Sequence, residues 1–97
     1  MSQPITYETL ELLKERGKLN FSEPQMQSVV QAWLRGKGIH IEPQFSLNEE
    51  GTNYEWWFYL YPRIGGGRIK FFPHEIGEGL DYEGALEIGL QEGLKLI

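Results

Sequence analysis

The chain of 97 residues contains no cysteine, which excludes disulfides, thiolate zinc sites, iron–sulfur clusters and a thiol nucleophile. It also has no apolar run close to the ~20 residues that a membrane-spanning helix needs. The polar start, Met1-Ser2-Gln3-Pro4, is unlike a signal peptide. From these absences we expect a cytoplasmic protein that does not associate with membranes.

Basic residues are scarce as well. Nine Lys and Arg stand against 14 Asp and Glu, so the net charge of −5 disfavours general nucleic-acid binding. What the chain does have is apolar and aromatic content, at 40% and 13% of the residues, which is enough to form a core. The length then indicates a single domain over residues 1–97.

Two helices are expected in the first third of the chain. Apolar residues at helical spacing predict one over residues 6–16, with Thr6 as its N-cap and Gly17 as a left-handed stop. Ser22-Glu23-Pro24-Gln25 reads as a capping box, so a second helix should begin directly after Ser22. That helix should end within the segment Arg35-Gly36-Lys37-Gly38.

From residue 39 the apolar period changes to two, which is typical of strands. The pattern predicts strands over residues 39–47, 54–61 and 68–72, with Pro43 placing the first at an edge or a bulge. Asp81 can cap a last helix over 82–96, in which Gly89 and Gly93 permit a close approach to the sheet. The expected fold is α+β: a three-stranded antiparallel meander with helices on one face, in the order α-α-β-β-β-α.

The strand over 54–61 has aromatic residues on both faces. If its even-numbered residues join the apolar residues Ile39, Ile41, Phe45 and Leu47 on the buried face, then Trp57, Tyr59 and Tyr61 lie on the open face. They would stand there beside His40, Glu42 and Gln44. This face is either a surface for binding or self-association, in its simplest form a homodimer, or a layer covered by a helix or by loops.

Basic residues and glycines gather between the last two strands. Arg63, Arg68 and Lys70 flank Gly65-Gly66-Gly67, and glycine loops can bind anions through their backbone N–H groups. The segment joins two strands and has no GxxxxGK[ST] pattern, so a flexible hairpin turn is the favoured interpretation. A nucleotide base stacked on Trp57 or Tyr59, with its phosphate near Arg63 and Arg68, is the alternative.

The sequence contains no pattern typical of a catalytic site or a metal site. His40 and His74 have no nucleophile beside them in any known pattern, so we do not expect an enzyme. The spacing of His74, Glu75, Glu78 and Asp81 matches no metal-ligand motif, and neither a metal site nor a cofactor is expected.

Two resemblances complete the analysis. The order β-β-β-α resembles the layout of double-stranded-RNA-binding domains, but Glu78-Gly79-Leu80-Asp81-Tyr82-Glu83 would repel phosphate where those domains are basic. The runs at residues 30–35, 38–41 and 82–90 resemble uncharacterised small proteins of phages and integrated mobile elements of Bacteroidetes-type gut bacteria. That resemblance implies a bacterial or phage setting and an accessory role, and it assigns no functional residues.

The sequence therefore predicts a small non-enzymatic binding or interaction module that uses the aromatic sheet face, with a protein or a second copy as partner. The alternative is a protein that binds a small anionic ligand of the nucleotide type.

Overall fold

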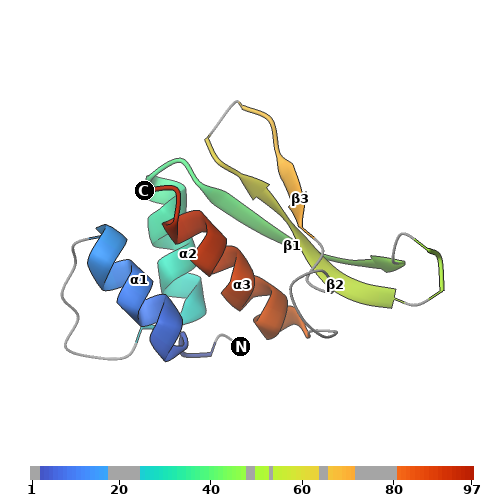
Figure 1. The fold of residues 1–97 in the computed structure, drawn as a ribbon, viewed down its shortest axis with the longest axis horizontal. Coiled ribbons are helices and arrows are strands. Elements are labelled where there is room, and N and C mark those ends of the chain that lie inside the picture. Colours follow the sequence, from blue (N-terminus) through green and yellow to red (C-terminus); the bar gives the residue numbers. More distant parts are fainter. Residues whose placement is uncertain (1–2, 18–24, 48–49, 53, 64–65, 72–80) are drawn as a thin grey trace.

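The computed structural model describes residues 3–17, 25–47, 50–52, 54–63, 66–71 and 81–97. In this part of the chain it has three helices and a three-stranded sheet, in the predicted order α-α-β-β-β-α (Figure 1). The elements are α1 (Tyr7–Gly17), α2 (Gln27–Gly36), β1 (His40–Leu47), β2 (Tyr54–Tyr61), β3 (Ile69–Phe71) and α3 (Tyr82–Leu94). No helix within the described ranges is long and apolar enough to cross a membrane.

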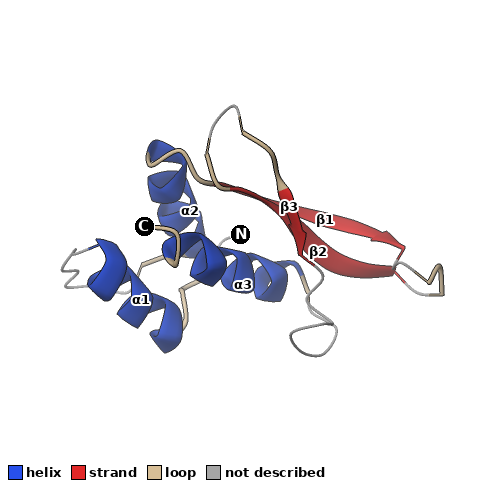
Figure 2. Cartoon of the chain, turned by 45° about the horizontal axis from the view of Figure 1, so that its top comes forward, coloured by secondary structure: helices blue, strands red, loops and turns tan. Residues whose placement is uncertain are grey.

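The sheet is an antiparallel meander with β2 in the centre and β1 and β3 as its neighbours. Pro43 therefore lies on an edge strand, as its missing N–H predicts. Figure 2 shows the helices gathered on one side of the sheet. Of these, α3 packs on β1 and β2, α2 packs on β1, and α1 packs on α3.

The core forms where α3 approaches the sheet most closely. A Cβ atom added at Gly89 would lie 2.6 Å from Cγ2 of Ile41, and one at Gly93 would lie 3.2 Å from Cδ1 of Leu34. Both distances are shorter than ordinary van der Waals contacts. The prediction that these two glycines permit close packing is confirmed. The two glycines lower the intrinsic helix propensity of α3. In return, the missing side chain at Gly89 lets the fully buried Phe58 pack directly against α3.

A buried carboxylate joins the three helices. Glu87 of α3 is 7% exposed, and its Oε2 accepts hydrogen bonds from the backbone N–H of Thr6 at 2.9 Å and from the hydroxyl of Thr9. Its Oε1 accepts a bond of 2.8 Å from Nε2 of Gln27 in α2. Gln91 donates to the Thr9 hydroxyl at 3.1 Å, so both oxygens of the buried carboxylate and the buried hydroxyl have partners.

The start of α2 differs from the prediction. Gln25 and Met26 precede the helix, and Met26 is extended, with φ −83° and ψ 149°. The backbone there pairs with the N-terminal segment: Ile5 N–H donates to the Gln25 carbonyl, and Gln27 N–H donates to the Gln3 carbonyl. These long-range bonds keep Gln25 out of the helix, so it does not begin directly after the predicted capping box. Residues 22–24 lie outside the described part of the chain.

Helix α1 has the predicted N-cap, because the Thr6 hydroxyl accepts a bond of 3.4 Å from the N–H of Thr9. Its predicted stop is wrong. Gly17 is the last helical residue and is not left-handed; the described glycines with positive φ are Gly38, at 87°, and Gly51, at 72°. Gly17 instead leaves room for a neighbour, since a Cβ there would lie 3.0 Å from the indole of Trp33.

Helix α3 begins as predicted, with the Asp81 carboxylate accepting a bond of 2.7 Å from the Gly84 N–H. It ends at Leu94, two residues before the predicted end.

Candidate functional site

The sheet face turned away from the helices carries the residues that the sequence analysis selected. Residues paired across antiparallel strands point to the same side, so the register places them together. We call this set the outer face: His40, Glu42, Gln44 and Ser46 from β1, Glu55, Trp57, Tyr59 and Tyr61 from β2, and Arg68 and Lys70 from the β3 segment.

Two cations lie on the aromatic rings of the outer face. The Arg68 guanidinium carbon stands 3.8 Å from the ring centre of Tyr59. The Lys70 ammonium stands 4.5 Å from the ring centre of Trp57. Both positions are within the ~6 Å range of cation–π attraction. The structure therefore brings the aromatic face together with two cations of the basic segment, which the sequence analysis joined only in its nucleotide-binding alternative.

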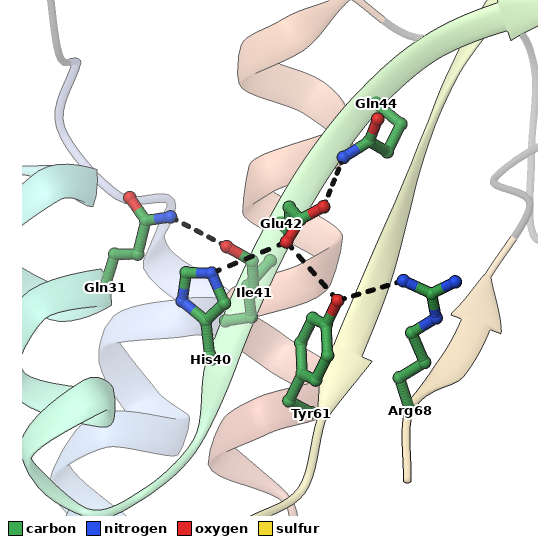
Figure 3. Close-up of polar contacts among 7 residues, drawn as sticks. All are labelled: Gln31, His40, Ile41, Glu42, Gln44, Tyr61 and Arg68. Atoms are coloured by element: carbon green, nitrogen blue, oxygen red, sulfur yellow. Dashed lines mark hydrogen bonds and ion pairs between the residues drawn. The ribbon is translucent and has the colours of Figure 1, made fainter. Parts of the chain in front are cut away.

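A hydrogen-bonded chain crosses the outer face from edge to edge (Figure 3). Arg68 Nη1 donates to the Tyr61 hydroxyl at 3.2 Å, and that hydroxyl donates to Oε2 of Glu42 at 3.4 Å. Gln44 donates to Oε1 of the same carboxylate at 2.6 Å. The hydrogen bond to Tyr61 raises the pKa of Arg68, a side chain that is charged throughout the physiological range even without it.

His40 stands at the edge of this chain. Its Nε2 lies 3.9 Å from Oε2 of Glu42, and its ring is 5.5 Å from that of Tyr61. Its Nδ1 is buried and has no hydrogen-bond partner among the described residues. The neighbouring residue, Ile41, holds the strand to α2 through its carbonyl, which accepts a bond of 2.9 Å from Gln31 (Figure 3).

Trp57 lies on the outer face but is only 6% exposed, so it is not the open ring that the alternation predicted. Its indole N–H donates to the Ser46 hydroxyl at 2.7 Å, and Tyr59 packs edge-on against it at 4.8 Å. Lys70 covers its ring. A base could stack on Trp57 or Tyr59 only after displacing a cation, which weakens the predicted stacking mode for nucleotides.

Arg63 is not brought into this set. It is exposed in the bend after β2, and its side chain lies against Gly66, whose Cβ, if present, would be 2.9 Å from Arg63 Cγ. The Gly66 N–H donates to the Arg63 carbonyl at 3.2 Å. Two other residues of the turn, at positions 64 and 65, lie outside the described residues.

The sequence analysis missed a second surface, on the helix side of the sheet. Phe45, Leu47 and Tyr54 were expected in the core, but they are 55%, 49% and 64% exposed. They form a tip cluster with Trp56 and Tyr82: Phe45 lies 5.0 Å from Trp56, whose ring is 5.3 Å from that of Tyr82. Figures 1 and 2 show the cause, because the hairpin extends beyond the helices. Element lengths indicate it too: eight strand residues span about 26 Å, and 13 helical residues about 20 Å.

A hollow on the helix side of the molecule is a weaker candidate for a binding site. It measures about 130 Å³ and lies where α1, α2 and the C-terminus meet, lined by Arg16, Gly17, Trp33, Lys37 and Ile97. Its volume is below the ~300 Å³ at which pockets for small organic ligands begin.

The imagined metal ligands His74, Glu75 and Glu78 lie outside the described residues, and Asp81 caps α3. In the described ranges no three acidic or histidine side chains are placed to hold a metal ion.

No protein-family model matches the chain, and comparison with curated proteins and with solved structures finds no similar one.

Proposed function

We propose that the protein is a non-enzymatic binding module whose contact surface is the outer face. The observation that carries the proposal is the ordered layer of rings and charges on a sheet face that no described helix covers. Tyrosine and arginine are the residue types that dominate contact energy in protein interfaces. A cytoplasmic setting, and an accessory role in a phage or mobile element, stay predictions of the sequence.

The side chains of the outer face are already held in place. Arg68 is fixed both by the Tyr59 ring and by the Tyr61 hydroxyl, and Glu42 is fixed by Tyr61 and Gln44. Association normally costs about 0.5–1.5 kcal/mol for each flexible side chain that becomes immobilised. Much of this entropy cost does not arise on binding, because Arg68 and Glu42 are already ordered in the folded chain.

A photo-crosslinking amino acid tests the proposal. Placed at Gln44 it leaves Tyr59, Tyr61 and Arg68 intact; the control position is Tyr7, which is 74% exposed on α1. Irradiation of bacterial cells that produce each protein should give an adduct of discrete mass from position 44, and none from position 7. No adduct from position 44, or the same adducts from both positions, would contradict the proposal.

A second candidate is the binding of a small anionic ligand by Arg68 and Lys70. Two cations that lie two residues apart on one sheet face, with Arg68 exposed, favour it. Thermal unfolding in the presence of millimolar nucleotides tests it, with Arg68→Ala as the control. A shift in the wild type that Arg68→Ala abolishes supports this function, and the absence of any shift counts against it.

A further inference from the structure

We propose that the outer face binds a second copy of this chain, in a two-fold dimer that pairs Arg68 of each copy with Glu42 of the other. This inference rests on the proposed function and names its partner. It is argued from the order of the charges across the sheet.

The outer face is positive along one edge and negative along the other. Arg68 and Lys70 come from the β3 side, and Glu42 comes from β1. Tyr59 and Tyr61 of the central strand lie between them, and a second carboxylate, Glu55, lies further along that strand, opposite Ser46. Figure 3 shows Arg68 and Glu42 on opposite sides of the Tyr61 hydroxyl, which bonds to both.

This order is self-complementary under one kind of symmetry. A two-fold axis that runs parallel to the strands and over β2 places β3 of one copy over β1 of the other and keeps each residue at its own level. The Arg68 guanidinium leans over Tyr59, and Tyr59 is the register partner of Glu42. The guanidinium of one copy therefore faces the carboxylate of the other, and the same contact forms twice. Facing sheets commonly pack with strands nearly aligned, as this arrangement requires.

Other modes of assembly are disfavoured by the same residues. Pairing of two copies through their β3 edges would bring Arg68 and Lys70 next to their own images, and cations at an edge oppose such pairing. The β1 edge carries Pro43, which lacks a backbone donor. An anionic ligand at Arg68 would meet the Glu42 carboxylate one hydroxyl away. A partner that supplies both charges satisfies both groups.

The size of the face sets the expected strength. Two strands about 26 Å long and a third about 10 Å long, spaced about 4.8 Å apart, present roughly 300 Å² per copy, against the ~800 Å² per partner of a standard interface. The dimer should therefore be weak and concentration-dependent. Its contact pairs remain effective at about 0.15 M ionic strength, where the Debye length of ~8 Å screens the longer-range repulsion between two chains of net charge −5.

Charge reversal on separate chains tests the pairing. Glu42→Arg gives a chain with cations at both positions, and Arg68→Glu gives a chain with carboxylates at both. Neither should pair with itself, and each should lose at least roughly tenfold in self-association, because like charges then face each other. An equimolar mixture should form heterodimers, since every facing pair is then of opposite sign. Native mass spectrometry separates the species by mass, and light scattering follows the wild type over a concentration series.

Tyr54→Ser is the matched control, because it changes an exposed aromatic of the tip cluster and leaves the outer face intact. It should dimerise as the wild type does, and circular dichroism should show all variants folded.

The inference is overturned by a wild type that stays monomeric up to about 1 mM, by variants that dimerise alone, or by a mixture without heterodimers. Loss of the dimer in Tyr54→Ser would move the interface to the tip cluster. A monomeric wild type that still gives a crosslink from position 44 to another protein would leave the proposed function standing and remove only the second copy as partner.

Discussion

Phe58 and Tyr59 are neighbours on the central strand, and they belong to two different environments. Phe58 faces α3, is fully buried, and stacks on Phe71 at 4.9 Å. Tyr59 faces outward, half-buried, with a guanidinium on its ring. Shape complementarity to a helix holds the inner face, while polar and cation–π contacts hold the outer face. The inner face is needed for folding, and the outer face is the one that we propose binds a partner.

Alanine substitution of Phe58 and of Tyr59, in separate variants, gives the largest expected difference between the two faces. Phe58→Ala should destabilise the fold by about 3–5 kcal/mol, since it leaves a cavity between the sheet and α3. Tyr59→Ala should cost roughly 1 kcal/mol, the value of its ring contacts, because solvent can fill its place. Chemical denaturation of the two variants measures both. Equal losses would show that the outer face is core as well.

Two hydrogen-bonded carboxylates, Glu87 on the helix side and Glu42 on the outer face, extend the comparison to polar groups. Glu87→Ala should cost about 3 kcal/mol, because it leaves the buried donors of Thr9 and Gln27, and the partly buried N–H of Thr6, without an acceptor. Glu42→Ala should cost less than about 1 kcal/mol, since its side chain is 40% exposed and water can replace it. Urea unfolding curves give both values. A larger loss in Glu42→Ala than in Glu87→Ala would reverse the account.

Glycine substitutions test how tightly the inner face is fitted. Gly89→Ala adds a methyl group 2.6 Å from Cγ2 of Ile41, a β-branched side chain that cannot turn away cheaply. We expect a loss of about 1–3 kcal/mol from overpacking, despite the gain in helix propensity. Gly36→Ala, with no atom within 4 Å of the new methyl, should be neutral or stabilise by under about 1 kcal/mol. Thermal unfolding distinguishes them, and a stable Gly89→Ala would contradict the close approach.

The smallest expected effect on stability is at Arg68, whose guanidinium is exposed. Arg68→Glu should lower the unfolding temperature only slightly, because it removes an exposed cation–π contact and an exposed hydrogen bond, while it loses self-association. Differential scanning calorimetry at a concentration low enough to keep both proteins monomeric makes the comparison fair. A large drop in its unfolding temperature would place Arg68 among the residues that hold the sheet together.

Local patterns predicted much of this architecture because they depend on neighbours in sequence. The period of two placed Tyr59 and Phe58 on opposite faces, and glycines one turn apart predicted the close approach of α3. The N-cap at Asp81 was also predicted correctly, because its carboxylate and the Gly84 N–H that it accepts from lie only three residues apart.

What the sequence did not reveal depends on long-range contacts. The bond between Thr6 and Glu87 joins residues 81 positions apart, and pairing with residues 3–5 keeps Gln25 out of α2. The leading prediction placed aromatic and polar residues of the first two strands on the outer face, and it included the basic residues only in the nucleotide-binding alternative. The contact between Arg68 and the Tyr59 ring depends on the register of β3 on β2. The spacing of residues along the sequence does not predict that register.

The measurement that tests the central claim most directly is a map of backbone amide NMR shifts recorded while the wild-type protein is diluted from about 1 mM. The account predicts that the amides that move lie along the outer-face strands, around Glu42, Tyr59 and Arg68, while those of α1 stay in place. Shifts confined to the tip cluster or to the helices, or none at all, would contradict it.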